Sequence, residues 1–322
     1  MRHVEVGGAR VSAIGLGTWQ FGSREWGYGE EYAERTAGAI VARALDLGIN
    51  LIDTAEVYAF GRSERIVGEA IAGRRDDVFL ATKLFPVAPV APVVVQRGRA
   101  SARRLGVDVI DLYQVHWPNP VVPLGTTMDG MARLVDDGVV RHVGVSNFDA
   151  DRWRRAEAAL GRPVLADQVA YSLVHRDPER DVLPHAAAAG RLVIAHSPLA
   201  QGLLSGRYDG RVSPSGIRAA NPLFLPENLE RAQPLLGALQ AIGVAHGATP
   251  AQVALAWVIR RPNVVAIPGA SSVAQVESNA AAADLDLTDE EDARLTAASD
   301  AFRPIRGPGA WARLLRLGPR RP

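Results

Sequence analysis

The chain has 322 residues, a formal net charge of +1 at pH 7 and no cysteine. The balanced charge gives no reason to expect nucleic acid or another polyelectrolyte as a partner, and the lack of cysteine excludes disulfides, thiolate metal sites and cysteine nucleophiles. The first residues lack the apolar core of a signal peptide and no apolar run approaches the length of a membrane span, so we expect a cytoplasmic protein without a bound metal.

The first predicted element is a β-hairpin over residues 3–12, with Gly7 and Gly8 at its turn. Short apolar segments that resemble strands then recur at intervals of about 30 residues. There are eight of them, at residues 14–18, 49–55, 78–83, 111–116, 142–147, 165–172, 192–199 and 264–271. They lack the alternation of half-exposed strands, which indicates parallel strands buried on both faces.

Amphipathic stretches of helical length separate most of these strands, at residues 35–47, 63–73, 93–105, 126–138, 149–160 and 177–190. Thr249 followed by Pro250 is typical of a helix start, and Ser272 would begin a further helix through about residue 283. Alternating strands and helices predict a (β/α)8 barrel, a single domain over residues 1–322 with the hairpin plugging one end. The alternative, a doubly wound sheet, is disfavoured because no G-x-G-x-x-G turn follows a strand.

Two segments depart from the repeating pattern. Residues 200–225 form a long stretch rich in glycine and proline, and such loops are usually functional in compact domains. The C-terminal tail, about residues 301–322, carries six arginines. We expect this tail to be solvated or loosely packed rather than a nucleic-acid or membrane patch.

Lys83 is the only lysine among the 36 basic residues of the chain. An ammonium is a compact charge whose pKa moves readily on burial, whereas a guanidinium stays protonated. The retained lysine therefore has two explanations: a site that needs an amine, or a coding bias toward arginine with one accidental survivor.

Polar side chains collect at the predicted C-terminal ends of the strands, where barrel enzymes carry out their chemistry. Asp53 and Lys83 end neighbouring strands and can form an ion pair, which avoids the cost of burying a lone charge. Such a pair could merely stabilise the barrel rim. The other polar strand ends converge on the same mouth and favour a functional site; they are Thr18, His116, Ser146, Asn147, Gln168, His196 and Ser197.

Tyr58 follows Asp53 by five residues and would lie on the loop above the strand. A free phenol has a pKa of about 10, and a neighbouring ammonium lowers it. Asp53 would keep Lys83 charged, and His116 could hydrogen-bond a substrate oxygen. A tyrosine taken alone is more often a packing residue, but this combination indicates a general acid aimed at a carbonyl group.

Several segments resemble the aldo-keto reductase family in order and spacing, over about residues 2–300. They are GINLIDTAEVYAFGRSE, FLATK, DLYQVH, RHVGVSNF, QVAYSLVHR, SPLAQGLLSGRY and IPGASSVAQVESN. The resemblance implies a (β/α)8 barrel that binds NADP(H), with NAD(H) less expected, and reduces an aldehyde or ketone to an alcohol. It implies a catalytic tetrad of Asp53, Tyr58, Lys83 and His116, in which Tyr58 protonates the carbonyl oxygen as hydride arrives from the nicotinamide.

The resemblance also implies the cofactor contacts. Amide and hydroxyl side chains would hold the carboxamide, the loop over 197–202 would wrap the pyrophosphate, and two arginines would bind phosphate. The turn before the helix at Ser272 would offer an anion site at a helix N-terminus. The implied set is Thr18, Trp19, Asp53, Ser146, Asn147, Gln168, His196, Ser197, Pro198, Leu199, Gln201, Gly202, Arg207, Arg218, Gly269, Ser271, Gln275 and Asn279.

Two positions depart from the family pattern. His196 stands where the family usually has an aromatic tyrosine or tryptophan stacked on the nicotinamide, and an imidazole could titrate near neutral pH. Ser271 and Ser272 stand where some members place lysine or arginine against the 2′-phosphate. A preference for NADPH would then depend more on Arg207, Arg218 and Ser271.

The mouth of the predicted barrel is aromatic, and we expect Trp19, Tyr28, Phe85 and Trp117 to line a pocket for a small carbonyl substrate. A homo-oligomer remains open. A second function is a nucleotide-sensing regulatory subunit that acts through a protein partner, because the family includes potassium-channel beta subunits. A third, a lyase with Lys83 as a Schiff-base amine, needs a neutral amine, and pairing with Asp53 would keep this one charged.

Overall fold

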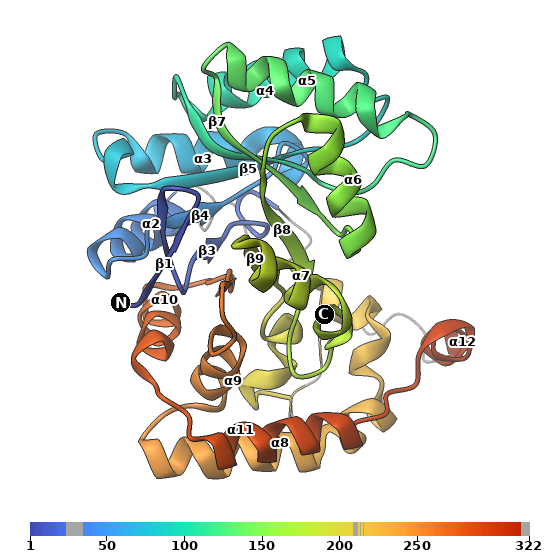
Figure 1. Ribbon diagram of the computed structural model, residues 1–322. Helices are drawn as coiled ribbons and strands as arrows, with labels where there is room; N and C mark the ends of the chain where they lie inside the picture. Colours follow the sequence, from blue (N-terminus) through green and yellow to red (C-terminus); the bar gives the residue numbers. More distant parts are fainter. Residues whose placement is uncertain (24–34, 209–211, 213, 215, 317–322) are drawn as a thin grey trace.

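The computed structural model describes residues 1–23, 35–208, 212, 214 and 216–316 (Figure 1). Eight parallel strands form one sheet in the order β10-β9-β8-β7-β6-β5-β4-β3. Their bounds are β3 Leu16–Gly17, β4 Leu51–Asp53, β5 Phe79–Leu84, β6 Ile110–Val115, β7 Val140–Ser146, β8 Val164–Ala170, β9 Leu192–His196 and β10 Val264–Ala266. Parallel bridges join Ile14 to Ala266 and Gly17 to Gly269, so the first and last strands meet and close the sheet into a barrel. The predicted (β/α)8 barrel and all eight predicted strands are confirmed.

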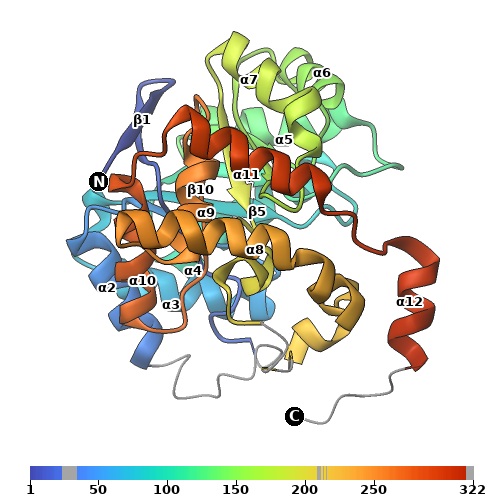
Figure 2. The same ribbon diagram turned by 90° about the horizontal axis from the view of Figure 1, so that it is seen from below.

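Helices follow the strands and surround the barrel (Figures 1 and 2). They are α2 Ala37–Asp46, α3 Arg62–Ile71, α4 Ala91–Leu105, α5 Leu124–Asp136, α6 Ala150–Leu160, α7 Val182–Ala189, α9 Pro250–Ile259 and α10 Val273–Ala281. The predicted helix start at Thr249 is confirmed, with a capping box in which Thr249 and Gln252 bind each other's backbone N–H groups. Ser272 likewise caps α10 by accepting a hydrogen bond from the Gln275 N–H.

Among the residues that the structure describes, three α-helices lie outside the predicted elements: α8 Pro226–His246, α11 Asp289–Ala301 and α12 Gly307–Arg316. Helix α8 contains Pro234. Because proline usually ends a helix, the sequence pattern did not predict a helix of this length. Helix α11 carries a capping box between Thr288 and Glu291 that is visible in the sequence. In Figures 1 and 2, α8 and α11 lie side by side along one flank of the barrel.

The hairpin of β1 (His3–Val6) and β2 (Ala9–Ser12) plugs the N-terminal end of the barrel, as predicted. Its apolar side chains form a buried cluster with residues at the starts of the barrel strands, including Leu51, Phe79 and Leu165. Gly7 has a φ of 55°, and a Cβ there would lie 2.4 Å from Leu165 Cδ1. The turn therefore needs glycine for its conformation, and the Leu165 side chain packs closely against it.

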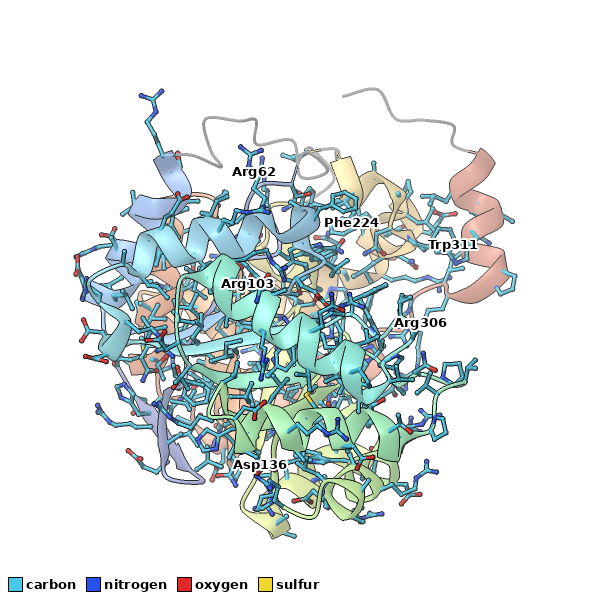
Figure 3. The ribbon with its side chains drawn as sticks, turned by 90° about the horizontal axis from the view of Figure 1, so that it is seen from above. Arg62, Arg103, Asp136, Phe224, Arg306 and Trp311 are labelled. Atoms are coloured by element: carbon cyan, nitrogen blue, oxygen red, sulfur yellow. The ribbon has the colours of Figure 1, made fainter. Side chains whose placement is uncertain are left out.

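The opposite end of the barrel carries the loops that follow the strands. Arg62, at the start of α3, and Phe224, in the short helix η8 (Pro222–Phe224), lie toward one end of the molecule in Figure 3, whereas Asp136, at the end of α5, lies toward the other. The long segment from residue 200 contains the one-turn helices η6 (Ala200–Ser205), η7 (Gly216–Ala220) and η8. These turns lie over the C-terminal mouth, where barrel enzymes place their active sites.

The first part of the C-terminal tail is anchored, which corrects the prediction of a loose tail. Phe302 is buried, and the buried Asn228 side chain both donates to the Ile305 carbonyl and accepts from the Ile305 N–H, at 3.1 and 2.7 Å. Arg313 pairs with Glu227 at 2.7 Å. Helix α12 stands away from the other helices in Figures 1 and 2, held by these contacts with the start of α8.

In the described part of the chain, no single helix has the length and apolar composition to cross a membrane; α8 and α9 reach that composition only as a pair, across a bend of 94°.

Candidate active site

A cavity of about 1090 Å³ opens at the C-terminal ends of the barrel strands. Tyr58 and His116 line it, together with every residue that the family resemblance assigned to the cofactor. Lys83 lies behind the lining, fully buried. The structure thus brings together residues spread from position 18 to position 279, although their individual roles stay predictions.

The ammonium of Lys83 lies at the centre of the polar cluster. Its Nζ donates to Asp53 Oδ2 at 2.6 Å, to the Thr54 carbonyl at 2.9 Å and to the Tyr58 hydroxyl at 3.3 Å. A lysine ammonium has three N–H donors, so all three have acceptors. Burial alone would lower the pKa of Lys83, but Asp53 and Tyr58 hold it above its ordinary value. Lys83 is therefore a fixed positive charge and does not titrate near neutral pH.

Asp53 is oriented by two amide side chains as well as by the ammonium. Gln168 Nε2 donates to Asp53 Oδ1 at 2.8 Å, and Gln114 Nε2 approaches the same oxygen at 3.4 Å. Gln114 lies opposite Lys83 in the register of β5 and β6 and is fully buried. The sequence signal for Gln114 was an amide inside an otherwise apolar strand, and the sequence analysis missed it.

Tyr58 keeps its proton at neutral pH. Burial raises the pKa of its hydroxyl, Lys83 lowers it and Asp53 raises it, and the net direction is upward. The sequence analysis expected Lys83 to lower this pKa; the ammonium does so, but burial outweighs it. A protonated phenol beside a fixed ammonium is arranged to donate a proton and then to have its phenolate stabilised.

His116 is a neutral imidazole in this environment. Burial, with the positive charge of Lys83 and the neighbouring His196, lowers the pKa of His116 to about 2. Its ring stacks on Trp117, with centroids 3.7 Å apart and planes 8° apart, and meets the Tyr58 ring nearly edge-on at 5.9 Å. The Nδ1 atom is buried without a hydrogen-bond partner in the described residues, so Nε2 is the nitrogen available to the cavity.

His196 is held by a chain of hydrogen bonds with a fixed direction. The Asn147 amide nitrogen donates to the His116 carbonyl at 3.0 Å, which leaves Asn147 Oδ1 to accept from His196 Nε2 at 3.3 Å. His196 Nδ1 is then free to accept from the Ser197 hydroxyl at 3.2 Å. Burial and the charge of Lys83 lower the pKa of His196 to about 4, so the expectation that it titrates near neutral pH is corrected.

A buried hydroxyl cluster fixes the backbone around Asp53. The Thr18 hydroxyl donates to the Asp53 carbonyl at 2.9 Å, and the Ser63 hydroxyl donates to the Thr18 carbonyl at 3.0 Å. Thr54 Oγ1 lies 2.9 Å from Ser63 Oγ. The sequence analysis placed Thr18 among the cofactor contacts. In the structure its hydroxyl joins the end of β3 to β4, and so it helps to position the Thr54 carbonyl that accepts a hydrogen bond from Lys83.

The loop after β9 forms the opposite wall of the cavity. Ser197, Ala200 and Gln201 have φ values of 53°, 49° and 56°, in the left-handed region that residues other than glycine seldom adopt. Arg218 Nε donates to the Gln201 carbonyl at 2.8 Å, which ties η7 to this loop. Arg207 also lines the cavity. This loop, with two arginines lining the cavity beside it, forms an arrangement suited to phosphate oxygens.

The start of α10 completes this wall. Gln275 Oε1 accepts from both the N–H and the hydroxyl of Ser271, at 2.7 and 3.0 Å. Asn279 Nδ2 approaches the Gly269 carbonyl at 3.4 Å. A Cβ at Gly269 would lie 2.8 Å from Gln20 Oε1, so the chain passes very close to the Gln20 side chain there. Gln20, which the sequence analysis missed, thus supports the turn before α10.

A sequence model of the Aldo/keto reductase family matches residues 13–300. The chain belongs to the aldo-keto reductase family.

The sequences and structures of relatives align with nearly the whole chain of this aldo-keto reductase. An uncharacterized oxidoreductase of Mycobacterium tuberculosis is 56% identical over 306 residues, which cover 95% of each chain. The glycerol dehydrogenase of Gluconobacter oxydans has a similar structure, with a TM-score of 0.86 and 30% identity over 94% of this chain and 97% of that one. An aldo-keto reductase of Klebsiella pneumoniae, solved with NADP and acetate, has a TM-score of 0.72 and 35% identity over 95% and 96% of the two chains.

The aromatic side chains of this aldo-keto reductase occupy only part of the predicted substrate pocket. Trp19 and Trp117 line the cavity, and the Trp19 ring lies 6.5 Å from that of Tyr58. Phe85 does not line it; this ring packs edge-on behind Trp117 at 5.6 Å, so its predicted place in the pocket is corrected. Tyr28 lies outside the described residues.

Two imidazoles with lowered pKa values, that of the buried His116 and that of the half-buried His196, should make the stability of this aldo-keto reductase depend on pH. His116 and His196 stay neutral down to pKa values of about 2 and about 4, whereas in the unfolded chain each takes up a proton near pH 6.5. The unfolded state then binds more protons as the pH falls, so stability is lost on acidification below about pH 6.5. Asp167, whose pKa burial raises well above its usual value, acts in the opposite direction, because its folded carboxyl group binds a proton more readily than the unfolded one does.

We therefore expect the midpoint of urea unfolding to fall less between pH 7 and pH 5 in His196→Gln than in the native chain. A difference between the two proteins isolates the contribution of His196 from the opposing one of Asp167. Equal slopes in the two proteins would contradict the lowered pKa of His196.

Proposed function

We propose that this aldo-keto reductase reduces an aldehyde or ketone to an alcohol with NADPH, with Tyr58 as the general acid. The observation that carries the proposal is the chain of contacts from Asp53 through Lys83 to the Tyr58 hydroxyl, at 2.6 and 3.3 Å, at the floor of a large cavity. It supplies a protonated phenol, a fixed positive charge behind it and a neutral imidazole beside it, which is what proton donation to a carbonyl oxygen requires.

The charged side chains that line the cavity favour an anionic cofactor. Asp53 is the only carboxylate that lines it in the described chain, and Lys83 neutralises this charge. Arg62, Arg207 and Arg218 also line it. A guanidinium group matches the geometry of phosphate oxygens, so arginines in the lining favour a ligand that carries phosphate groups. The Klebsiella pneumoniae relative, solved with NADP, favours the same assignment.

The amide side chains fit a nicotinamide at the centre of the cavity. Gln168 Nε2 is committed to Asp53, and no described donor reaches its Oε1, which leaves an acceptor for a carboxamide N–H. His196 would present its ring face to the same group. Bound NADPH supplies the hydride. The loop after β9, with Arg207 and Arg218, would hold the phosphates, and Ser271, Gln275 and Asn279 would hold the adenosine end.

Each residue of the tetrad then has a separate task. Tyr58 transfers its proton to the carbonyl oxygen, and Lys83 stabilises the resulting phenolate through the contact at 3.3 Å. Asp53 keeps the ammonium charged and in place. His116 donates from Nε2 to the carbonyl oxygen and orients it, which leaves the unpartnered Nδ1 as a lone pair rather than a buried N–H.

The direct test follows the loss of NADPH absorbance with a panel of aldehydes that includes 4-nitrobenzaldehyde. We expect turnover with several members of the panel, and slower turnover with NADH. A protein that binds NADPH and turns over no carbonyl compound would overturn the proposal and favour a nucleotide-sensing role.

A second prediction concerns the stacking residue. His196→Tyr should tighten NADPH binding several-fold, because a phenol ring covers more of the nicotinamide than an imidazole does. Both His196→Tyr and His196→Phe lose the hydrogen bond from His196 Nε2 to Asn147, so His196→Phe serves as the comparison that gains ring area without a phenol hydroxyl. Titration of protein fluorescence with NADPH measures both. Unchanged or weaker binding in both variants would remove the stacking argument.

A further inference from the structure

Glu56 lies in the chain between Asp53 and Tyr58, but its side chain is directed away from the cavity. It does not line the cavity of the described structure, and only 8% of its side chain is exposed. A carboxylate enclosed to this degree needs partners, because burying an unpaired charge is very costly. None of the tasks assigned to the tetrad uses Glu56, although it is enclosed two residues before the proposed general acid.

Both carboxylate oxygens of Glu56 are held from the far side of the loop that follows β5. The Phe85 N–H donates to Oε1 at 2.5 Å. The Arg97 guanidinium, on α4, binds the same carboxylate through two nitrogens: Nη2 lies 2.7 Å from Oε1, and Nε donates to Oε2 at 3.0 Å. Paired N–H···O bonds between a guanidinium and a carboxylate fix the orientation of the carboxylate as well as its position.

These contacts join the segment of Tyr58 to the strand that carries Lys83. The Glu56 N–H donates to the Lys83 carbonyl at 3.4 Å, and Phe85, whose N–H binds the carboxylate, follows Lys83 by two residues. Tyr58 follows Glu56 by two residues, and its N–H donates to the Ala55 carbonyl at 3.1 Å. Glu56 therefore connects the two backbone segments on either side of the contact between Lys83 Nζ and the Tyr58 hydroxyl.

The same carboxylate also supports the rings behind His116. The Phe85 ring packs edge-on against Trp117 at 5.6 Å, and Trp117 stacks on His116 with centroids 3.7 Å apart. Because Glu56 binds the Phe85 N–H, it fixes the backbone from which that ring extends. The phenol, the ammonium and the imidazole of the tetrad are thus all connected to this one carboxylate.

We propose that Glu56 is a positioning residue of the reaction: held by Arg97, it sets the distance between Lys83 and the Tyr58 hydroxyl, and with it the alignment of the proton that Tyr58 donates. A misplacement of about 1 Å can cost an enzyme roughly a hundredfold in rate. The contact of 3.3 Å between Lys83 Nζ and the hydroxyl therefore leaves little room for movement. This inference rests on the proposed carbonyl reduction and adds to it a residue outside the tetrad.

Asp111 offers a matched comparison near the other end of β5. Its carboxylate, 2% exposed, accepts from the Leu80 N–H of β5 at 2.9 Å and pairs with Arg75 at 2.6 Å and with Arg141. Asp111 thus makes the same kinds of bonds as Glu56, to a backbone N–H and to arginine. It lies near the start of β6, however, and does not line the cavity. A purely structural role for Glu56 would make the two carboxylates equivalent.

The test compares Glu56→Ala with Asp111→Ala, using NADPH and the panel aldehyde that the native protein reduces fastest. Rates are expressed per NADPH site counted by fluorescence titration, so that unfolded protein does not contribute. We expect kcat of Glu56→Ala to fall by roughly tenfold to a hundredfold. KM and the dissociation constant of NADPH should stay within about twofold, because Glu56 touches neither ligand. Asp111→Ala should keep kcat within about twofold of the native value.

Two further variants serve if the alanine variants do not fold. Glu56→Gln keeps an acceptor for the Phe85 N–H and loses the ion pair with Arg97, so its kcat should fall by less than that of Glu56→Ala but below that of the native protein. Asp111→Asn is its control and should retain the native kcat.

The solvent isotope effect provides a measurement that a loss of stability alone would not change. Poor alignment of the Tyr58 proton slows proton transfer relative to the other steps. The ratio of kcat in H₂O to kcat in D₂O should therefore rise in the Glu56 variants and keep its native value in the Asp111 variants.

Three results would overturn the inference: a native kcat per NADPH site in the Glu56 variants, equal losses of kcat in the Glu56 and Asp111 variants, or a fall in kcat with an unchanged solvent isotope effect. A loss confined to KM would also contradict it, since Glu56 would then act on binding. Absence of turnover by the native protein with every aldehyde would instead overturn the proposed carbonyl reduction on which the inference rests.

Discussion

Tyr58→Phe should nearly abolish carbonyl reduction and leave cofactor binding intact. The substitution removes the one hydroxyl that Lys83 contacts at 3.3 Å and keeps the ring that meets Trp19 and His116. General acid catalysis by a positioned side chain contributes about a hundredfold to ten-thousandfold, so we expect kcat to fall by about three orders of magnitude. NADPH absorbance measures the rate, and fluorescence titration measures the dissociation constant of NADPH.

Tyr113→Phe is the matched control for this experiment. Tyr113 lies on β6, is fully buried and does not line the cavity. Its loss of a hydroxyl should leave kcat within about twofold of the native value, since no proton passes through it. Full activity in Tyr58→Phe, or an equal loss in both variants, would refute the assignment of Tyr58 as the general acid.

Lys83→Met should be among the most destabilising single substitutions in this protein. It leaves Asp53, which is 2% exposed, as a buried carboxylate whose ammonium partner at 2.6 Å is gone. Breaking a buried ion pair by removing one partner costs about 3–5 kcal/mol. We expect a loss of that size in the free energy of unfolding by urea. The two amides that contact Asp53 cannot replace a full charge.

The double variant Lys83→Met/Asp53→Asn separates stability from function. Replacing both partners removes the uncompensated charge, so most of the lost stability should return. Activity should stay low, because Tyr58 has lost the ammonium that stabilises its phenolate. The exposed pair of Arg99 and Asp137, at 2.9 Å, is the control, and Arg99→Met should cost no more than about 1 kcal/mol. A double variant as unstable as Lys83→Met would show that the pair does not act as a unit.

The barrel could be predicted from the sequence because its strands are buried on both faces. Segments such as 78–83 and 111–116 are apolar runs of strand length that end in a polar residue, and each is a strand in the structure. Helix α8 could not be predicted in the same way, since Pro234 interrupts the pattern, although α8 continues through it in the structure and lies beside α11. Apolar runs in the sequence were therefore enough to predict the strands, whereas the local pattern around Pro234 was not enough to predict helix α8.

The site shows the same division. Lys83 and Asp53 could be paired in advance because they end neighbouring strands, and their contact at 2.6 Å follows from that register. The net rise in the pKa of the Tyr58 hydroxyl could not be predicted from the sequence, because the direction of the shift depends on how much water the surrounding loops exclude. The second amide on Asp53, Gln114, and the pairing of Glu56 with Arg97 likewise depend on contacts between elements far apart in sequence. The roles of all these residues stay predictions until the variants are measured.

The burial of Lys83 has a consequence for chemical labelling. Because Lys83 is the only lysine and is fully enclosed, the folded surface offers no lysine amine to an acylating or cross-linking reagent. Succinimidyl esters and dialdehyde fixatives would therefore find no accessible lysine side chain on the folded protein, and the catalytic ammonium would escape them. The folded protein also presents no surface lysine to the aldehydes that it is proposed to consume.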